Sequence, residues 1–365
     1  MSLTAGIVGL PNVGKSTLFN AITKSQVEAA NYPFATIDKN VGVVTVPDER
    51  VKRLSEIFNP KKTIYTTFEF TDIAGLVEGA SQGEGLGNKF LGHIREVDAI
   101  CHVVRCFHDV DITHVAGKVD PILDIEVVEL ELLLADTQTI DNRFEKLEKR
   151  YKVDKSVAQE YNALKKIKAA LDDGKPASSV SLDEEEEKLI NSYHLLTKKP
   201  MIYVANIDEE DVANPENNPD YLKVKEYAAK TNRSIIAISA HMEEELSSLD
   251  DEETRVFLKE LGLDASGLDK IIFEAYRILG LKTFFTVGAD EVRAWTFYEG
   301  MTAPQCAGII HTDFQRGFIR AEAYHVDDIF ELKTELAIKE KGRLRSEGKQ
   351  YLVKDGDVLH FRFNV

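Results

Sequence analysis

The segment GLPNVGKS, residues 9–16, decides the fold of this chain, because it matches the pattern GxxxxGK[ST]. It follows the apolar run 5–8 and precedes the helix-like run 17–22. In a strand–loop–helix arrangement, glycines let successive backbone N–H groups face a phosphate, and the helix N-terminus favours the same negative charge. The segment therefore predicts a phosphate-binding loop at the start of an α/β domain.

The side chains of this loop have separate expected roles. We expect Lys15 to neutralise the β- and γ-phosphate oxygens, and the Ser16 hydroxyl to bind Mg²⁺. Asn12 occupies a position that coordinates a monovalent cation in some related nucleotide switches, so stimulation by K⁺ is a hypothesis. The predicted nucleotide-binding residues of the loop are Asn12, Val13, Gly14, Lys15, Ser16 and Thr17.

A second phosphate-site element is expected at the end of a later strand. The apolar run 66–71 is followed by Asp72 and, three residues on, by Gly75, which gives the pattern DxxG. We expect Asp72 to hold the magnesium through water and the Gly75 N–H to meet the γ-phosphate, with the glycine-rich stretch 79–87 as a loop gated by that contact. Thr36 is the candidate switch residue whose hydroxyl completes the metal shell.

Hydrophobic periodicity divides the rest of the chain. Apolar runs at 99–104, 201–205 and 235–238 predict further buried strands, so the fold class is α/β with a mostly parallel sheet. Between them, 124–170 lacks Gly and Pro and has helical spacing, interrupted near 172–176, which predicts an inserted helical hairpin. Short strands after Leu281 predict a small α+β module. The expected division is 1–123 and 199–281 for the nucleotide-binding domain, 124–198 for the helical insert, and 282–365 for the C-terminal domain.

Composition excludes several classes of protein. The 365 residues are 43% hydrophobic and 29% charged, which is typical of a globular protein rather than a disordered one. Apolar runs stay well below the roughly 18 residues of a membrane-spanning helix. The three cysteines form no CxxC pair, which fits a reducing, cytoplasmic compartment. A formal net charge of −17 argues against nonspecific coating of nucleic acid.

The charge is unevenly distributed along the chain. Residues 282–365 contain 12 Lys and Arg against 13 Asp and Glu, so most of the excess acidity precedes them. Within 145–168 there are eight Lys or Arg and four acids, and a second basic cluster spans 339–349. Each cluster alone is typical of a solvated helix face, but together they leave room for a groove that binds an RNA backbone.

The base-recognition motif departs from that of GTP-binding proteins. Those proteins use NKxD, whose Asp accepts from guanine N1–H and the N2 amino group. Here the strand 201–205 leads into Asn206, with Ile207 in place of Lys and Glu209 in place of Asp. Glu is one methylene longer, so the paired acceptor for guanine should be displaced, whereas the Asn206 amide suits adenine N6 and N7. Loss of a hydrogen-bonded discriminator can remove a specificity of about 10⁴ or more, so ATP is permitted.

Together these motifs resemble the YchF-type, Obg-like ATPases of the translation-factor-related P-loop class. The resemblance extends over essentially the whole chain, including 31–37, 72–80, 206–209 and the ending 353–358. It implies a nucleotide domain with an inserted α-helical domain, a C-terminal β-grasp TGS domain, ATP preferred over GTP, and association with ribosomes, with the large subunit or ribosomal RNA as the expected contact. In the fifth nucleotide motif, His241 replaces the Lys usual in GTP-binding relatives.

Catalysis is the least determined part of the prediction. Ras-like enzymes orient the attacking water with a Gln directly after DxxG, but this chain has Leu76 there. The family resemblance points to His114 as the water-positioning residue, and His93 is a weaker candidate. Two alternatives stay open: a GTPase in which Glu209 still reads guanine, and a ribosome- or RNA-binding switch whose slow hydrolysis only resets it.

Overall fold

The computed structural model describes residues 3–25, 40–73, 86–109, 112 and 119–364. Their contacts divide the chain into two compact units, each described below by itself. The first comprises Met1–Val44 and Glu69–Ile271, and the second Thr45–Phe68 and Ile272–Val365. The sequence did not predict that 45–68 would group with the C-terminal part, and the four-segment division stays a prediction.

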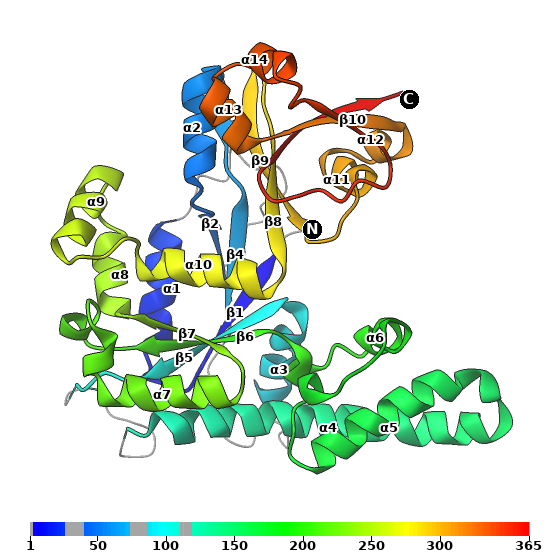
Figure 1. The fold of residues 1–365 in the computed structure, drawn as a ribbon. Helices are drawn as coiled ribbons and strands as arrows, with labels where there is room; N and C mark the ends of the chain where they lie inside the picture. The colour runs from blue at the N-terminus through cyan, green and yellow to red at the C-terminus, as the bar shows by residue number, and fades with distance from the viewer. Residues whose placement is uncertain (1–2, 26–39, 74–85, 110–111, 113–118, 365) are drawn as a thin grey trace. The chain divides into compact units, whose positions relative to one another are not determined.

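A parallel sheet forms the centre of the first unit, as expected. Its strand order is β2-β4-β1-β5-β6-β7 (Figure 1), and β1 pairs in parallel with β4 and β5, β5 with β6, and β6 with β7. The strands are β1 (Thr4–Val8), β2 (Val41–Thr45), β4 (Thr67–Asp72), β5 (Ala99–Arg105), β6 (Met201–Asn206) and β7 (Ser234–Ile238).

The strand order places the phosphate loop at a change of direction in the sheet. On one side of β1 the sheet continues through β4 to the edge strand β2, and on the other side it continues through β5, β6 and β7. In open α/β sheets, ligands bind beyond the carboxyl ends of the strands at such a switch point. The loop 9–14 follows β1 directly, so the fold brings it to that position.

Helices complete the first unit. The long helices α4 and α5 lie side by side (Figure 1), and their facing side chains form a core of their own that includes Ile140, Leu147, Leu164 and Ile167. This confirms the expected helical hairpin. The helices that begin in this unit are α1 (Lys15–Lys24), α3 (Leu86–Glu96), α4 (Pro121–Val153), α5 (Ala158–Asp172), α6 (Glu184–Asn191), α7 (Pro219–Lys230), α8 (Ala240–Leu246), α9 (Asp251–Glu260) and α10 (Gly267–Ile278).

A buried carboxylate joins the hairpin to the sheet. Asp136 of α4 accepts hydrogen bonds from the backbone of Leu196 at 2.9 Å and from the backbone and hydroxyl of Thr197 at 2.8 and 2.7 Å. Burial raises the pKa of Asp136, and the bonds from Thr197 and Leu196 oppose that shift. The segment that leads into β6 is therefore fixed to α4, which helps to position the base motif at the other end of that strand.

The second unit contains a mixed sheet of order β11-β10-β12-β8-β9-β3. The pairs β8·β9, β10·β12 and β10·β11 are antiparallel, whereas β12·β8 and β3·β9 are parallel. Its strands are β3 (Lys62–Ile64), β8 (Leu281–Thr286), β9 (Glu291–Tyr298), β10 (Phe318–His325), β11 (Arg345–Glu347) and β12 (Asp357–Phe363). Its helices are α2 (Glu49–Phe58), α11 (Ala303–Ile310), α12 (Thr312–Arg316), α13 (Val326–Leu332) and α14 (Glu335–Glu340).

The early segment 45–68 contributes directly to the core of this unit. Val51 and Leu54 of α2 are buried in one cluster with Phe285 and Val292. Asp48 caps α2 by accepting from the Arg50 N–H at 2.9 Å, and Arg50 also bonds Asp355 at 2.8 Å. The α/β class, with a P-loop domain followed by a C-terminal α+β part, is thus confirmed, while the TGS assignment stays a prediction. None of the described helices is long and apolar enough to cross a membrane.

Candidate nucleotide site

A cavity of about 810 Å³ opens beside the phosphate loop in the first unit. It is lined by loop and α1 residues at one end and by the segments after β6 and β7 at the other. The residues predicted from sequence that line it are Asn12, Gly14, Lys15, Ser16, Thr17, Asn206, Ile207 and Glu209. The site residues nominated from two distant parts of the chain are therefore brought together.

The phosphate end of the cavity is built from buried groups. Lys15 is only 9% exposed, and its Nζ donates to the carbonyl oxygen of Leu10 at 2.9 Å. Gly14 has a φ of 96°, a left-handed conformation that favours glycine, and a Cβ added there would lie 2.2 Å from Asn206 Nδ2. The loop is thus held in a conformation that its glycine makes accessible.

Lys15 and Asp72 act on each other's charge. Burial lowers the pKa of the Lys15 ammonium, and the Asp72 carboxylate opposes that shift. Burial likewise raises the pKa of Asp72, and Lys15 opposes it. Asp72 does not line the large cavity; it lines a smaller one of about 260 Å³, together with His93. The electrostatic coupling nevertheless connects the end of β4 to the phosphate loop.

Asn206 connects the two ends of the cavity. It is 4% exposed, its Nδ2 donates to the Val13 carbonyl at 3.0 Å, and its Oδ1 accepts from the Ala240 N–H at 2.9 Å. These bonds join β6 to the phosphate loop and to the start of α8. In this structure the amide acts as a connector, and the adenine contact expected from the sequence stays a prediction.

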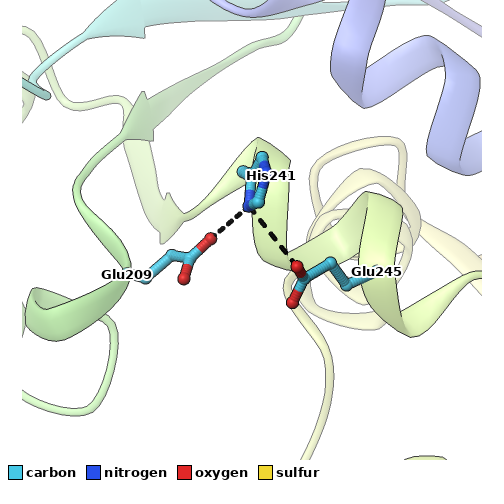
Figure 2. Close-up of side chains that lie close together, drawn as sticks. All are labelled: Glu209, His241 and Glu245. Atoms are coloured by element: carbon cyan, nitrogen blue, oxygen red, sulfur yellow. Dashed lines mark hydrogen bonds and ion pairs between the residues drawn. The ribbon is translucent and has the colours of Figure 1, made fainter. Parts of the chain in front are cut away.

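The base end of the cavity is built from exposed, charged side chains. Glu209 begins a short 3-10 helix, Glu209–Asp211, after β6, and its carboxylate is hydrogen-bonded to His241 Nδ1 (Figure 2). Ile207, at the position of the usual Lys, is buried in the core of the unit and bonds through its N–H to the Ile238 carbonyl at 2.8 Å. Because Ile207 replaces Lys, the second position of the motif packs in the core instead of carrying a charge.

A buried arginine organises another part of the cavity wall, and sequence reasoning missed it. Arg105 ends β5 at 2% exposure, and its guanidinium donates to the carbonyls of Phe107 at 3.4 Å, Asp109 at 3.1 Å and Ile112 at 3.0 Å. It also lies 4.5 Å from the centre of the Phe107 ring. A charged residue at the end of an otherwise apolar strand was the signal that could have revealed it.

Three predicted site residues lie outside the described residues: Thr36, Gly75 and His114. The same holds for Leu76, after the DxxG motif. For a magnesium ion, the described residues supply the hydroxyl of Ser16 and the carboxylate of Asp72. Both are oxygen donors of the kind that Mg²⁺ prefers, so the donor set fits the ion.

Part of each basic cluster is paired with acids inside its own unit. In the helical hairpin, Lys166 bonds Glu186, Lys168 bonds Asp141 and Arg150 bonds Asp154 at 3.4 Å. Arg343 and Arg345, in the C-terminal cluster, likewise contact acidic partners. The expected RNA groove therefore has fewer available charges than the sequence count suggested.

Comparison with known proteins places this geometry in a family. A family model described as "50S ribosome-binding GTPase" matches residues 4–131, and the YchF-GTPase_C model, described as "Protein of unknown function (DUF933)", matches 281–364. A curated protein of Bacillus subtilis, "Ribosome-binding ATPase YchF", is 58% identical over 100% of both chains, and one of Escherichia coli O157:H7 with the same name is 50% identical over the same extent. The chain belongs to the YchF family.

Solved structures agree with that assignment. The structure described as "Structure of the Schizosaccharomyces pombe YchF GTPase" has a TM-score of 0.90 and 41% identity, and the match covers 99% of this chain and 98% of that one. A "GTP binding protein from Pyrococcus horikoshii OT3" has a TM-score of 0.63 at 22% identity over the full length of both, which shows shared fold alone. The YchF relatives thus carry both ATPase and GTPase in their names. The family resemblance drawn from the motifs is confirmed.

Proposed function

We propose that this chain is an ATPase that hydrolyses ATP to ADP and phosphate and acts as a nucleotide-dependent factor that binds ribosomes. The observation that carries the proposal is the cavity that joins a complete phosphate loop to a base end in which Glu209 replaces the guanine-reading Asp. Full-length identity of 50–58% to proteins named ribosome-binding ATPase supports the same function.

The phosphate chemistry follows from the buried end of the cavity. Lys15 binds the β- and γ-phosphate oxygens, exchanging its bond to the Leu10 carbonyl for the stronger charge of the phosphates. Mg²⁺, when bound, neutralises the charge that develops on the transferred phosphoryl group. The proposed ligands of that ion are Ser16 and Thr36, with Asp72 holding it through water and the Gly75 N–H facing the γ-phosphate.

We assign to His114 the positioning of the water molecule that attacks the γ-phosphate. An alkyl side chain at Leu76 cannot orient or deprotonate water, so another group has to enter the site. Without a group in that role, intrinsic turnover would be slow. A K⁺ ion bound near Asn12 is a further proposed activator. Equal turnover in matched Na⁺ and K⁺ buffers would contradict this proposal.

The base end favours ATP over GTP. Guanine recognition of the NKxD kind needs a carboxylate that accepts two hydrogen bonds, and Glu209 is both longer than Asp and bonded to His241. The competing function is a GTPase with the same fold, which the name of the Schizosaccharomyces pombe relative favours. Direct competition between the two nucleotides decides between them.

The proposed partner is the large ribosomal subunit, through its RNA, in the cytoplasm. Cosedimentation of the full chain with ribosomes without nucleotide, with ADP and with a nonhydrolysable ATP analogue tests partner and gating together. We expect binding that changes between the ADP and ATP-analogue states. Lys15→Ala should abolish the nucleotide dependence, whereas Lys24→Ala, an exposed lysine on the same helix, should preserve it. Absence of the chain from the ribosome pellet in every state would contradict the proposal.

A binding switch with only slow hydrolysis is the second candidate, because Leu76 stands where Ras-like enzymes place a catalytic Gln. His114→Ala separates the two. A loss of turnover of about 10²-fold or more would support catalysis by His114. Unchanged turnover combined with nucleotide-dependent ribosome binding would favour the switch.

A further inference from the structure

A histidine and two glutamates meet at the base end of the cavity. His241 and Glu245 lie one turn apart on α8, and Glu209 starts the short helix after β6. Figure 2 shows the His241 ring directed toward both carboxylates. Its Nδ1 is hydrogen-bonded to Oε1 of Glu209 and lies 3.9 Å from Oε1 of Glu245.

The backbone that carries this cluster is fixed by buried contacts. Glu243, two residues after His241, accepts hydrogen bonds from the N–H groups of Gly267 at 2.7 Å and Leu268 at 3.1 Å. At the first residue of the helix, the Ala240 N–H donates to Asn206 Oδ1. Because α8 is held from the inside, the outward position of His241 beside Glu209 is a property of the fold.

The surroundings of His241 favour its charged form. The hydrogen bond from Glu209 raises the pKa of His241, and the charges of Glu209, Glu245 and Glu244 add to that effect, while partial burial opposes it. Glu244 is itself bonded to Lys24 of α1 at 3.0 Å. These surroundings therefore favour the protonated, cationic form of His241.

We propose that His241 is a specificity-determining residue of the nucleotide site, because it occupies one oxygen of the Glu209 carboxylate. A guanine base presents two donors, N1–H and the N2 amino group, and needs both oxygens of one carboxylate. Adenine has neither donor on that edge, so its binding is not weakened when His241 occupies one oxygen of Glu209. His241 therefore disfavours guanine nucleotides relative to adenine nucleotides. The inference rests on the proposed preference for ATP and names the group that enforces it.

The ratio of two affinities isolates this effect. Removing a cation from the rim makes the mouth of the cavity more negative and weakens every nucleotide alike. That general loss cancels when the Kd for GDP is divided by the Kd for ADP. Diphosphates are not hydrolysed at the γ position, and binding in EDTA removes any metal that could bridge the three side chains.

Calorimetric titration of ADP and GDP into the full chain, its His241→Ala variant and its His241→Gln variant is the test. His241 is 69% exposed on its side chain, so neither substitution should unfold the protein. We expect His241→Ala to lower the GDP-to-ADP ratio of Kd values about threefold to fivefold, the scale of an exposed ion pair. His241→Gln retains a hydrogen-bond donor but no charge, so it should keep only the part of the selectivity that a neutral donor supplies.

A pH profile supplies a readout that a merely structural role would not move. Because the pKa of folded His241 is raised, the charged part of its interaction with Glu209 is complete below the ordinary value and is lost as pH rises through the raised one. The ratio should therefore fall in the unmodified chain, toward that of His241→Gln, as pH rises from below the ordinary titration range of histidine to above it. It should stay flat in His241→Gln. Glu245→Gln, which removes the other facing acid, should move the transition to lower pH.

The outcomes separate the inference from the proposed function. If the unmodified chain prefers ADP and the ratio is the same in His241→Ala at every pH, the inference is overturned while the ATP preference stands. If the unmodified chain binds GDP at least as tightly as ADP, the proposed base preference is itself wrong, and the inference falls with it.

Discussion

The phosphate end and the base end of one cavity differ in burial: buried groups form the first, and exposed charged side chains form the second. At the phosphate end, Gly14 and Lys15 act through backbone conformation and a buried ammonium group. At the base end, Glu209 and His241 are 50% and 69% exposed and act through charged side chains. In the proposed function, the buried, conformationally fixed groups supply affinity that every nucleoside triphosphate shares. The exposed, titratable groups are proposed to adjust which base is preferred and to respond to the solvent.

The largest effect is expected from the phosphate end. Gly14→Ala forces an L side chain into a left-handed φ of 96° and places a Cβ 2.2 Å from Asn206 Nδ2. Backbone strain and displaced Asn206 bonds together cost about 3 kcal/mol, or about 100-fold in affinity. Titration should show ATP and GTP weakened equally. A variant that lost affinity for only one of the two nucleotides would contradict this division of roles between the phosphate end and the base end.

Gly92→Ala is the matched control for this substitution. Nothing lies within 4 Å of a Cβ added at Gly92, which is inside α3. The change should leave nucleotide affinity intact and raise helix stability by about 0.5–1 kcal/mol.

The connector between the ends should give a smaller effect on both. Asn206→Ala removes the bonds to the Val13 carbonyl and leaves the buried Ala240 N–H without its acceptor. The cost is about 1–3 kcal/mol, so ATP and GTP affinities should fall about tenfold to 100-fold together, as measured by calorimetry. Asn142→Ala, at an exposed position on α4, is the control. An effect on one nucleotide alone would mean that the amide reads the base directly.

The buried histidine His102 should make the stability of the folded chain depend on pH. His102 lies in β5 opposite Val8, is 1% exposed, and its Nδ1 has no hydrogen-bond partner among the described residues. Burial, with the charges of Arg233 and Lys15, lowers the pKa of His102 to about 3. The unfolded chain therefore binds a proton that the folded one refuses, and stability falls as pH drops below about 6.5.

This linkage predicts a measurable loss of stability in acid. Between neutral pH and pH 5, His102 should cost about 2 kcal/mol of the free energy of unfolding. Denaturant titrations should show that His102→Leu flattens this part of the profile. His241→Ala, at the exposed base end, should not. A profile that is identical in His102→Leu and the unmodified chain would mean that His102 is not held neutral.

The smallest predicted effect is that of salt on base selectivity. Exposed charges are screened as the Debye length falls to about 3 Å at 1 M salt. The GDP-to-ADP ratio of Kd values should therefore fall slightly as salt rises, toward that of His241→Ala. A ratio that rises with salt would show that selectivity does not depend on the exposed pair.

The sequence predicted the elements whose signals are local. The phosphate loop, the strands β1, β5 and β6, and the helical hairpin follow from patterns within a few turns of chain. The position of β3 does not follow from a local pattern. This strand is only three residues long, and it pairs with β9, which lies more than 200 residues away in the sequence. The turn between α4 and α5, near Asp154, was also missed, because a polar Asp between helical runs resembles an exposed helix position.

The candidate site shows the same limit. Spacing identified Lys15, Asn206 and Glu209 individually, and the fold brings all three to one cavity. Spacing could not reveal that Asn206 is bonded on both sides by backbone, or that His241 lies against Glu209, since each depends on segments joined only in three dimensions. Spacing also could not reveal which basic residues pair with acids from other segments, as Lys166 does with Glu186 and Arg343 with Asp328.

The most direct test of the account is competition between ATP and GTP for the full chain in the presence of Mg²⁺. With both nucleotides at equal concentration, the account predicts that ATP is bound more tightly and that ADP and phosphate are the main products. Lys15→Ala should remove the products from both. Preferential binding and hydrolysis of GTP would contradict the central claim that the altered base end makes this chain an ATPase.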